Sequence, residues 1–79
     1  MKINKAVSIK LLNICKERNI SVNKLASICC LTQSTIENIV CCNSKNPKLL
    51  TIVRICEGLN ISLSEFFDDA VFFNIERED

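Results

Sequence analysis

The pattern of apolar positions between Leu25 and Ile39 predicts two short helices joined by a tight turn. Leu25, Ala26 and Cys29 recur at helical spacing and form one apolar face of the first helix. Ile36 and Ile39 lie about one helical turn apart and give the second helix its inward face. The pattern therefore predicts a helix, a turn and a second helix in direct succession.

The other positions of the second helix are short and polar. Thr32 is its candidate N-cap, because a threonine hydroxyl accepts a hydrogen bond from a backbone N–H two or three residues further on. Gln33, Ser34, Glu37 and Asn38 then face outward. Side chains of this kind match the donors and acceptors of the DNA major groove. The segment thus predicts a helix-turn-helix that contacts DNA.

Apolar stripes and caps elsewhere predict three further helices, so the expected fold is all-α. Glycine and proline occur once each, which argues against hairpins. The first three expected helices cover residues 5–18, 22–29 and 33–41. A fourth helix is expected to begin at Asn46-Pro47, and its apolar stripe extends to Leu59. A fifth helix is expected to start at the capping box Ser62–Glu65. Together they predict a compact five-helix bundle.

A chain of 79 residues makes one domain at most, and we expect it to span residues 1–69. The remaining tail, residues 70–79, is compatible with an extension of the last helix, a strand or loose packing. The fifth helix and the tail together carry more apolar surface than so small a core is expected to bury. We therefore expect a homodimer through Phe66, Phe67, Val71, Phe72 and Phe73, joined by Leu50 and Val53.

Charge is distributed unevenly along the chain, although the net charge is only +1. Residues 1–54 carry nine cationic and two acidic side chains, a net charge of +7. Residues 55–79 carry one cationic and seven acidic side chains, a net charge of −6. Such a molecule can turn a basic face toward phosphate and keep its acidic end away from it, although two solvated faces of an ordinary domain give the same pattern.

The six cysteines are expected to be reduced and free of metal. Neither a secretory signal nor a transmembrane segment is evident, so we expect a cytoplasmic protein in a reducing compartment. Adjacent cysteine pairs without histidine do not have the usual spacing of zinc ligands. No cofactor and no small-molecule site are predicted.

Several motifs in this chain resemble the phage repressor and Cro-like helix-turn-helix family, also called the Xre family. They are the pair Leu25-Ala26, the run 32–36, Asn46-Pro47 and the run 59–66, which occur in the family's order and spacing. The resemblance extends over about residues 7–67 and implies a repressor-like bundle that binds double-stranded DNA, with a palindromic operator as the expected target.

The resemblance also implies two sets of contact residues. The family's base-reading positions fall on Thr32, Gln33, Ser34 and Asn38. Phosphate contacts fall on Ser21, Asn23, Thr35, Asn43, Ser44, Lys45 and Asn46. Glutamine and asparagine each make paired hydrogen bonds to adenine, and the exposed N–H groups at a helix start favour anions.

Five positions depart from the family pattern, among them Cys15 and Val40, where the family often pairs an arginine with a glutamate. Glycine is usual in the tight turn and just after the second helix of the motif, where this chain has Cys30 and Cys42. Either these cysteines adopt a strained left-handed conformation or the turns have another geometry. Val22 replaces a glutamine that commonly touches phosphate, so that contact is lost.

The leading hypothesis is a sequence-specific transcriptional regulator that reads the major groove with residues 33–41. The alternative is a protein-interaction module of the same fold, antitoxin-like or an adaptor, because no Lys or Arg occurs from Thr32 to Ser44. A thiol-based redox or metal sensor is a third possibility. An enzyme is not expected, since the chain lacks histidine and a glycine-rich phosphate loop.

Overall fold

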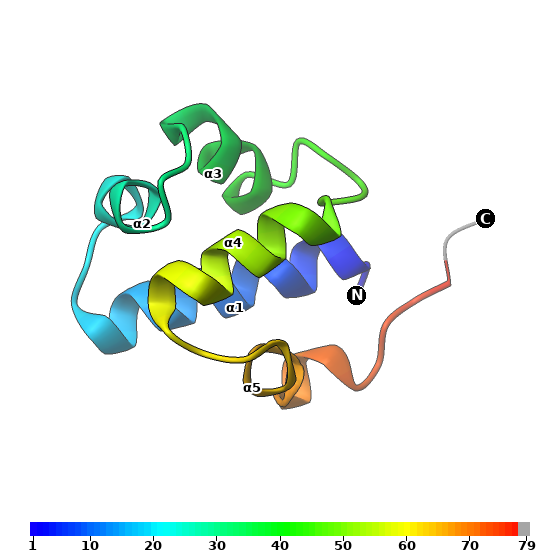
Figure 1. Ribbon diagram of the computed structural model, residues 1–79. Coiled ribbons are helices and arrows are strands. Elements are labelled where there is room, and N and C mark those ends of the chain that lie inside the picture. Colours follow the sequence, from blue (N-terminus) through cyan, green and yellow to red (C-terminus); the bar gives the residue numbers. More distant parts are fainter. Residues whose placement is uncertain (78–79) are drawn as a thin grey trace.

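Residues 1–77 form a bundle of five α-helices followed by a single 3₁₀ turn (Figure 1). The computed structural model describes residues 1–77, and these contain no strand. The elements are α1 (Ile3–Arg18), α2 (Val22–Ile28), α3 (Gln33–Val40), α4 (Leu49–Leu59), α5 (Leu63–Phe67) and η1 (Ala70–Phe72). The predicted all-α, five-helix fold is confirmed.

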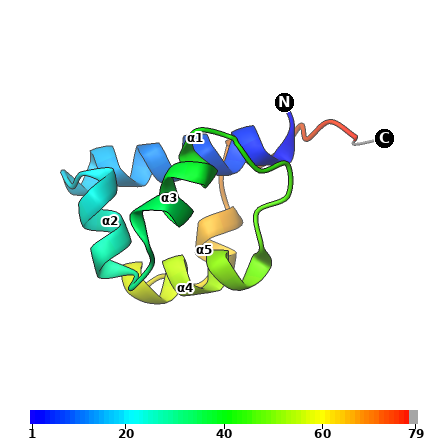
Figure 2. The ribbon, with the colours of Figure 1, turned by 90° about the horizontal axis from the view of Figure 1, so that it is seen from above.

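One hydrophobic core lies between the helices. Seen from above, α1 and α4 form opposite sides of the bundle and α2 closes one end (Figure 2). Helix α3 packs mainly on α1 and α2. The largest fully buried apolar side chains are Leu11, Leu25, Ile36, Ile55, Leu59 and Phe66. Every helix except the short η1 contributes a buried residue, which ties the bundle together around one centre.

Three helix starts are defined by the side chains that the sequence indicated. Ser21, Thr32 and Ser62 each accept a hydrogen bond from the backbone N–H three residues on, at 3.0, 3.2 and 3.0 Å. At Ser62 the Glu65 carboxylate accepts in return from the backbone N–H at 3.1 Å, which completes the capping box. These caps satisfy backbone donors that lack a partner within the helix.

The start of α4 differs from the prediction. Helix α4 begins at Leu49 with the extended Lys48 as its N-cap residue, and Asn46-Pro47 belongs to the preceding loop. The Asn46 N–H donates to the Ser44 hydroxyl at 3.3 Å, which keeps this segment in a turn. A residue that precedes proline also disfavours helical backbone angles. The half-buried Pro47 therefore packs as part of the loop and does not initiate the helix.

The apolar part of the tail folds onto its own domain. Phe66 is fully buried, and the rings of Phe67 and Phe72 lie 5.0 and 6.0 Å from its ring centroid. Phe72 is half-buried against the core, whereas Phe73 is 74% exposed. The apolar surface available for the predicted dimer is therefore smaller than expected. Phe66 is buried and cannot contact a second chain, and Phe72 is partly covered within its own chain.

An ion pair fixes the tail to α1 just before η1. The Lys10 ammonium lies 2.9 Å from the Asp69 carboxylate, and the same carboxylate accepts the Val71 N–H at 3.0 Å. The Val71 N–H, followed by Lys10, lowers the pKa of Asp69 below its ordinary value. The ionised carboxylate therefore both caps η1 and links it to α1.

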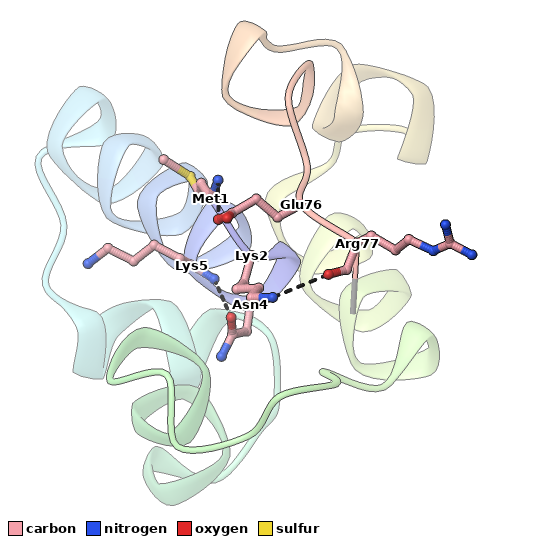
Figure 3. Close-up of polar contacts among 6 residues, drawn as sticks. All are labelled: Met1, Lys2, Asn4, Lys5, Glu76 and Arg77. Atoms are coloured by element: carbon pink, nitrogen blue, oxygen red, sulfur yellow. Dashed lines mark hydrogen bonds and ion pairs between the residues drawn. The ribbon is translucent and has the colours of Figure 1, made fainter. Parts of the chain in front are cut away.

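The tail then returns to the start of α1 (Figure 3). The Glu76 carboxylate lies 2.7 Å from the α-ammonium group of Met1, which lowers the pKa of Glu76. The Glu76 N–H donates to the Met1 carbonyl oxygen at 2.9 Å, and the Lys2 ammonium donates to the Arg77 carbonyl oxygen at 3.2 Å. The predicted tail boundary at residue 70 thus falls at η1, while residues 78–79 of that tail lie outside the described residues.

Gly58 permits a close approach between α4 and the end of α2. A Cβ atom at this position would lie 2.8 Å from both the Cα and the Sγ of Cys29, and 3.1 Å from the Ile28 carbonyl oxygen. Two of these three neighbours are backbone atoms, so they move only if the end of α2 moves. The only glycine of the chain is therefore a packing requirement that the apolar pattern does not reveal.

We expect Gly58→Ala to lower the free energy of unfolding by about 1–3 kcal/mol, because overpacking outweighs the gain in helix propensity. Urea unfolding followed by circular dichroism measures the effect. Glu57→Ala, at an exposed position of the same helix, is the matched control and should change stability little. A Gly58→Ala protein as stable as the wild type would contradict the close approach.

Candidate nucleic-acid interface

The turn between α2 and α3 contains a cysteine in the left-handed conformation. Cys30 has φ 56°, and its N–H donates to the Ser27 carbonyl oxygen at 3.2 Å. The Leu31 N–H donates to the Ala26 carbonyl oxygen at 3.0 Å. These two bonds form a Schellman motif, in which glycine is the usual left-handed residue. A cysteine thus adopts here the left-handed conformation that usually requires glycine.

The end of α3 repeats this arrangement. Cys42 has φ 59°, and its N–H donates to the Ile39 carbonyl oxygen at 3.2 Å. The Asn43 N–H donates to the Asn38 carbonyl oxygen at 2.9 Å. The Cys42 thiol also lies 3.8 Å from the Asn4 carbonyl oxygen, which links this turn to α1. Helix α3 is therefore bracketed by two left-handed turns.

A buried hydroxyl holds α3 against α1. Ser8 is 2% exposed, and its Oγ donates to the Val40 carbonyl oxygen at 2.6 Å. This bond satisfies one of the last carbonyl groups of α3, which have no partner within the helix. The sequence patterns did not indicate Ser8, because a lone serine among apolar positions gives no signal of its partner.

The outward face of α3 presents the predicted base-reading residues. Thr32, Gln33, Ser34 and Asn38 are all exposed, while Ile36 and Ile39 on the inward face are 0% and 5% exposed. The amide groups on this face are already ordered within the protein. Gln33 Nε2 donates to Glu37 Oε1 at 2.8 Å, and Asn43 Nδ2 donates to Asn38 Oδ1 at 3.2 Å.

A groove beside α3 brings several of the predicted residues together. It has a volume of about 340 Å³ and is lined by Thr35, Asn38, Ile39, Ser44, Asn46, Pro47, Lys48 and Thr51. The loop that forms its rim is tied to α1, because Asn4 Nδ2 donates to the Ser44 carbonyl oxygen at 3.2 Å. The groove thus joins the polar face of α3 to the loop that follows it.

The other predicted phosphate-contact residues do not line this groove. Lys45 is exposed on the same loop, and Asn43 contacts Asn38 at the end of α3. Ser21 and Asn23 are exposed at the start of α2 and do not line the groove. Lys48 and Thr51 were not predicted, because the assumed helix start at Pro47 placed both inside α4. The lysine directly after Asn46-Pro47 was the sequence feature that could have indicated a residue of the groove at this point.

The thiols divide into a buried and a more exposed set. Cys15, Cys29 and Cys56 are buried, Cys42 is half-buried, and Cys30 and Cys41 are exposed; all six are free. Burial, with smaller contributions from the neighbouring thiols of Cys30, Cys15 and Cys56, raises the pKa of Cys29 to about 11. Within residues 1–77, no group of three or more His, Cys, Asp or Glu side chains could hold a metal ion. The buried thiols therefore behave as small apolar side chains.

We expect Cys30→Gly to raise the free energy of unfolding by about 1 kcal/mol, because it relieves the left-handed strain at an exposed position. Cys41→Gly is the matched control: Cys41 is also exposed but has φ −86°, so glycine gains nothing there. Urea unfolding of both variants measures the difference. Equal effects of the two substitutions would argue against strain at Cys30.

The comparison with family models gives one match. Residues 10–70 match the model of the Cro/C1-type HTH DNA-binding domain. Searches of curated proteins and of solved structures find no match. No helix within residues 1–77 has the length and apolar character needed to cross a membrane. The family match confirms the resemblance inferred from the sequence motifs.

Proposed function

We propose that this chain, a member of the Cro/C1-type HTH DNA-binding domain family, is a sequence-specific transcriptional regulator. In this proposal, helix α3 reads the major groove. The observation that carries this proposal is the exposed polar face of α3, bracketed by two left-handed turns and bordered by the groove at its C-terminal end. We also propose that the protein acts in the cytoplasm, the location that the sequence analysis predicts.

Base recognition is assigned to Thr32, Gln33, Ser34 and Asn38. These side chains are exposed on one helix, whose inward face is anchored by Ile36 and Ile39. Glutamine and asparagine can each make two hydrogen bonds to adenine N6 and N7. A helix that carries such groups at its N-terminal end is suited to direct contact with base edges.

Phosphate contacts are assigned to Thr35 within α3 and to the elements around that helix. They comprise Ser21, Asn23, Thr35, Asn43, Ser44, Lys45 and Asn46, to which the groove adds Lys48. The cationic residues lie on the loop and not on the reading helix, so attraction of phosphate by positive charge and base recognition come from separate segments. Neutralisation of phosphates supplies most of the non-specific affinity, and the base contacts select the sequence.

Two alanine substitutions test this division. Gln33→Ala should cost about 1–3 kcal/mol on the preferred duplex and relax selectivity at one base pair. Lys45→Ala should weaken all duplexes alike and reduce the salt slope of binding by about 1. The preferred duplex is first selected from random sequences, and fluorescence anisotropy at several salt concentrations then gives both quantities.

The opposite outcomes are equally informative. Equal losses for Gln33→Ala on preferred and random DNA would contradict base reading, and an unchanged salt slope would remove Lys45 from the phosphate contacts. Weak binding of the wild type to every duplex would favour the alternative function, a protein-interaction module. That alternative is supported by the absence of Lys and Arg between Thr32 and Ser44.

We further propose that the protein binds a palindromic site as a homodimer. Phe73, Leu49 and Leu50 are 74%, 64% and 59% exposed. Leu49 and Phe67 also line an apolar groove of about 380 Å³ together with Ile3, Val7, Asn46, Pro47, Lys48 and Ile52. The protomer measures 34 × 23 × 21 Å, so two copies fit on half-sites about 34 Å apart.

Sedimentation of the wild type should show a dimer at micromolar concentration. Leu49→Asp combined with Phe73→Asp should give a folded monomer, because charged side chains replace exposed apolar ones without opening the core. Leu12→Asp, at an exposed apolar position on α1, is the matched control and should leave the dimer intact. A wild-type monomer that binds with one protomer per DNA site would contradict the proposal.

A further inference from the structure

The carboxylate of Glu37 lies within the predicted base-reading surface. Gln33 Nε2 and Glu37 Oε1 are 2.8 Å apart, and both side chains are exposed on α3 at positions four residues apart. A carboxylate only accepts hydrogen bonds, so the amide nitrogen must be the group that faces it. The orientation of the Gln33 amide is therefore fixed by the chemistry of its partner.

We propose that Glu37 is a specificity-determining positioning residue, an inference that rests on the proposed base reading by Gln33. The amide nitrogen of Gln33 carries two hydrogens. One donates to Glu37, while the other, with the carbonyl oxygen, remains for adenine N7 and N6. Glu37 thereby holds the amide in the orientation that an adenine edge requires before DNA arrives.

The neighbouring amide pair has a different property. Asn43 and Asn38 lie 3.2 Å apart through Nδ2 and Oδ1, but each amide contains both a donor and an acceptor. Such a pair can form with either group as donor, so it does not select one orientation. Gln33 with Glu37 is thus the pair on this face whose polarity is defined by chemistry.

The charge of Glu37 has a second effect on recognition. Glu37 is the one ionisable side chain between Thr32 and Ser44, apart from the thiols of Cys41 and Cys42. Its negative charge opposes the approach of phosphates and of the guanine acceptors O6 and N7. The remaining acceptor capacity of the carboxylate matches the amino group of cytosine. Glu37 therefore lowers affinity for random DNA while it raises selectivity.

Two substitutions separate positioning from charge. Glu37→Ala removes both, whereas Glu37→Gln removes the charge and keeps a hydrogen-bonding group that can pair with Gln33 in either polarity. The full chain is tested by fluorescence anisotropy at one fixed salt concentration. The probes are the selected duplex, four duplexes that differ only at the base pair read by Gln33, and a random duplex. Thermal unfolding checks that each variant is folded.

We expect Glu37→Ala to reduce the adenine preference at that base pair about fivefold or more, and Glu37→Gln to recover only part of it, because a pair of amides does not fix one polarity. Both variants should bind the random duplex more tightly than the wild type. Glu37→Ala combined with Gln33→Ala should lose no more adenine preference than Gln33→Ala alone. Glu17→Ala, which removes an exposed carboxylate from α1, is the control and should keep the wild-type base preference.

The results distinguish this inference from the function on which it rests. If Glu37→Ala keeps the wild-type adenine preference while Gln33→Ala loses it, base reading stands and the role of Glu37 is overturned. If Glu37→Ala changes thermal stability but no base preference, the pair is only a helix-surface contact and the inference is again overturned. If the wild type does not distinguish the duplexes, both proposals fail together.

Discussion

The direction of α3 depends on two left-handed residues, Cys30 before the helix and Cys42 after it. At each position the chain reverses within a Schellman motif, and an L-residue adopts this conformation at a cost of roughly 1–2 kcal/mol. The surrounding contacts offset that cost: Leu31 packs on the core, and the Ser8 hydroxyl bonds the end of α3 to α1. The polar face of the helix is exposed because both ends are fixed in this way.

Much of this fold follows from local chemistry that can be read in the sequence. The caps at Ser21, Thr32 and Ser62 define helix starts through neighbouring backbone groups, so the residue types indicate them. The inward faces of α3 and α4 follow from spacing alone. The start of α4 could not be predicted in this manner, because Pro47 is compatible with both a first helical turn and a loop, and tertiary packing selects the loop.

The exposure of the candidate site residues could be predicted from the sequence, but their contacts could not. The family register placed Gln33, Ser34 and Asn38 on one exposed face, and the structure agrees. The hydrogen bond from Gln33 to Glu37 depends on side-chain rotamers, and the position of Lys48 in the groove depends on the end of the loop. Gly58 gave no signal at all, because its importance lies in a distance between two helices.

The way the tail is attached gives the molecule a graded local stability. Phe72 is held by ring contacts next to the core, and the side chains of the Lys10–Asp69 ion pair are 16% and 31% exposed. The side chains of the Met1–Glu76 ion pair are 37% and 60% exposed, so water and salt screen this pair more than the Lys10–Asp69 pair. The backbone N–H of Phe72 should therefore be better protected against hydrogen exchange than that of Glu76. The segment around Glu76 then opens before η1, while the five-helix core remains closed.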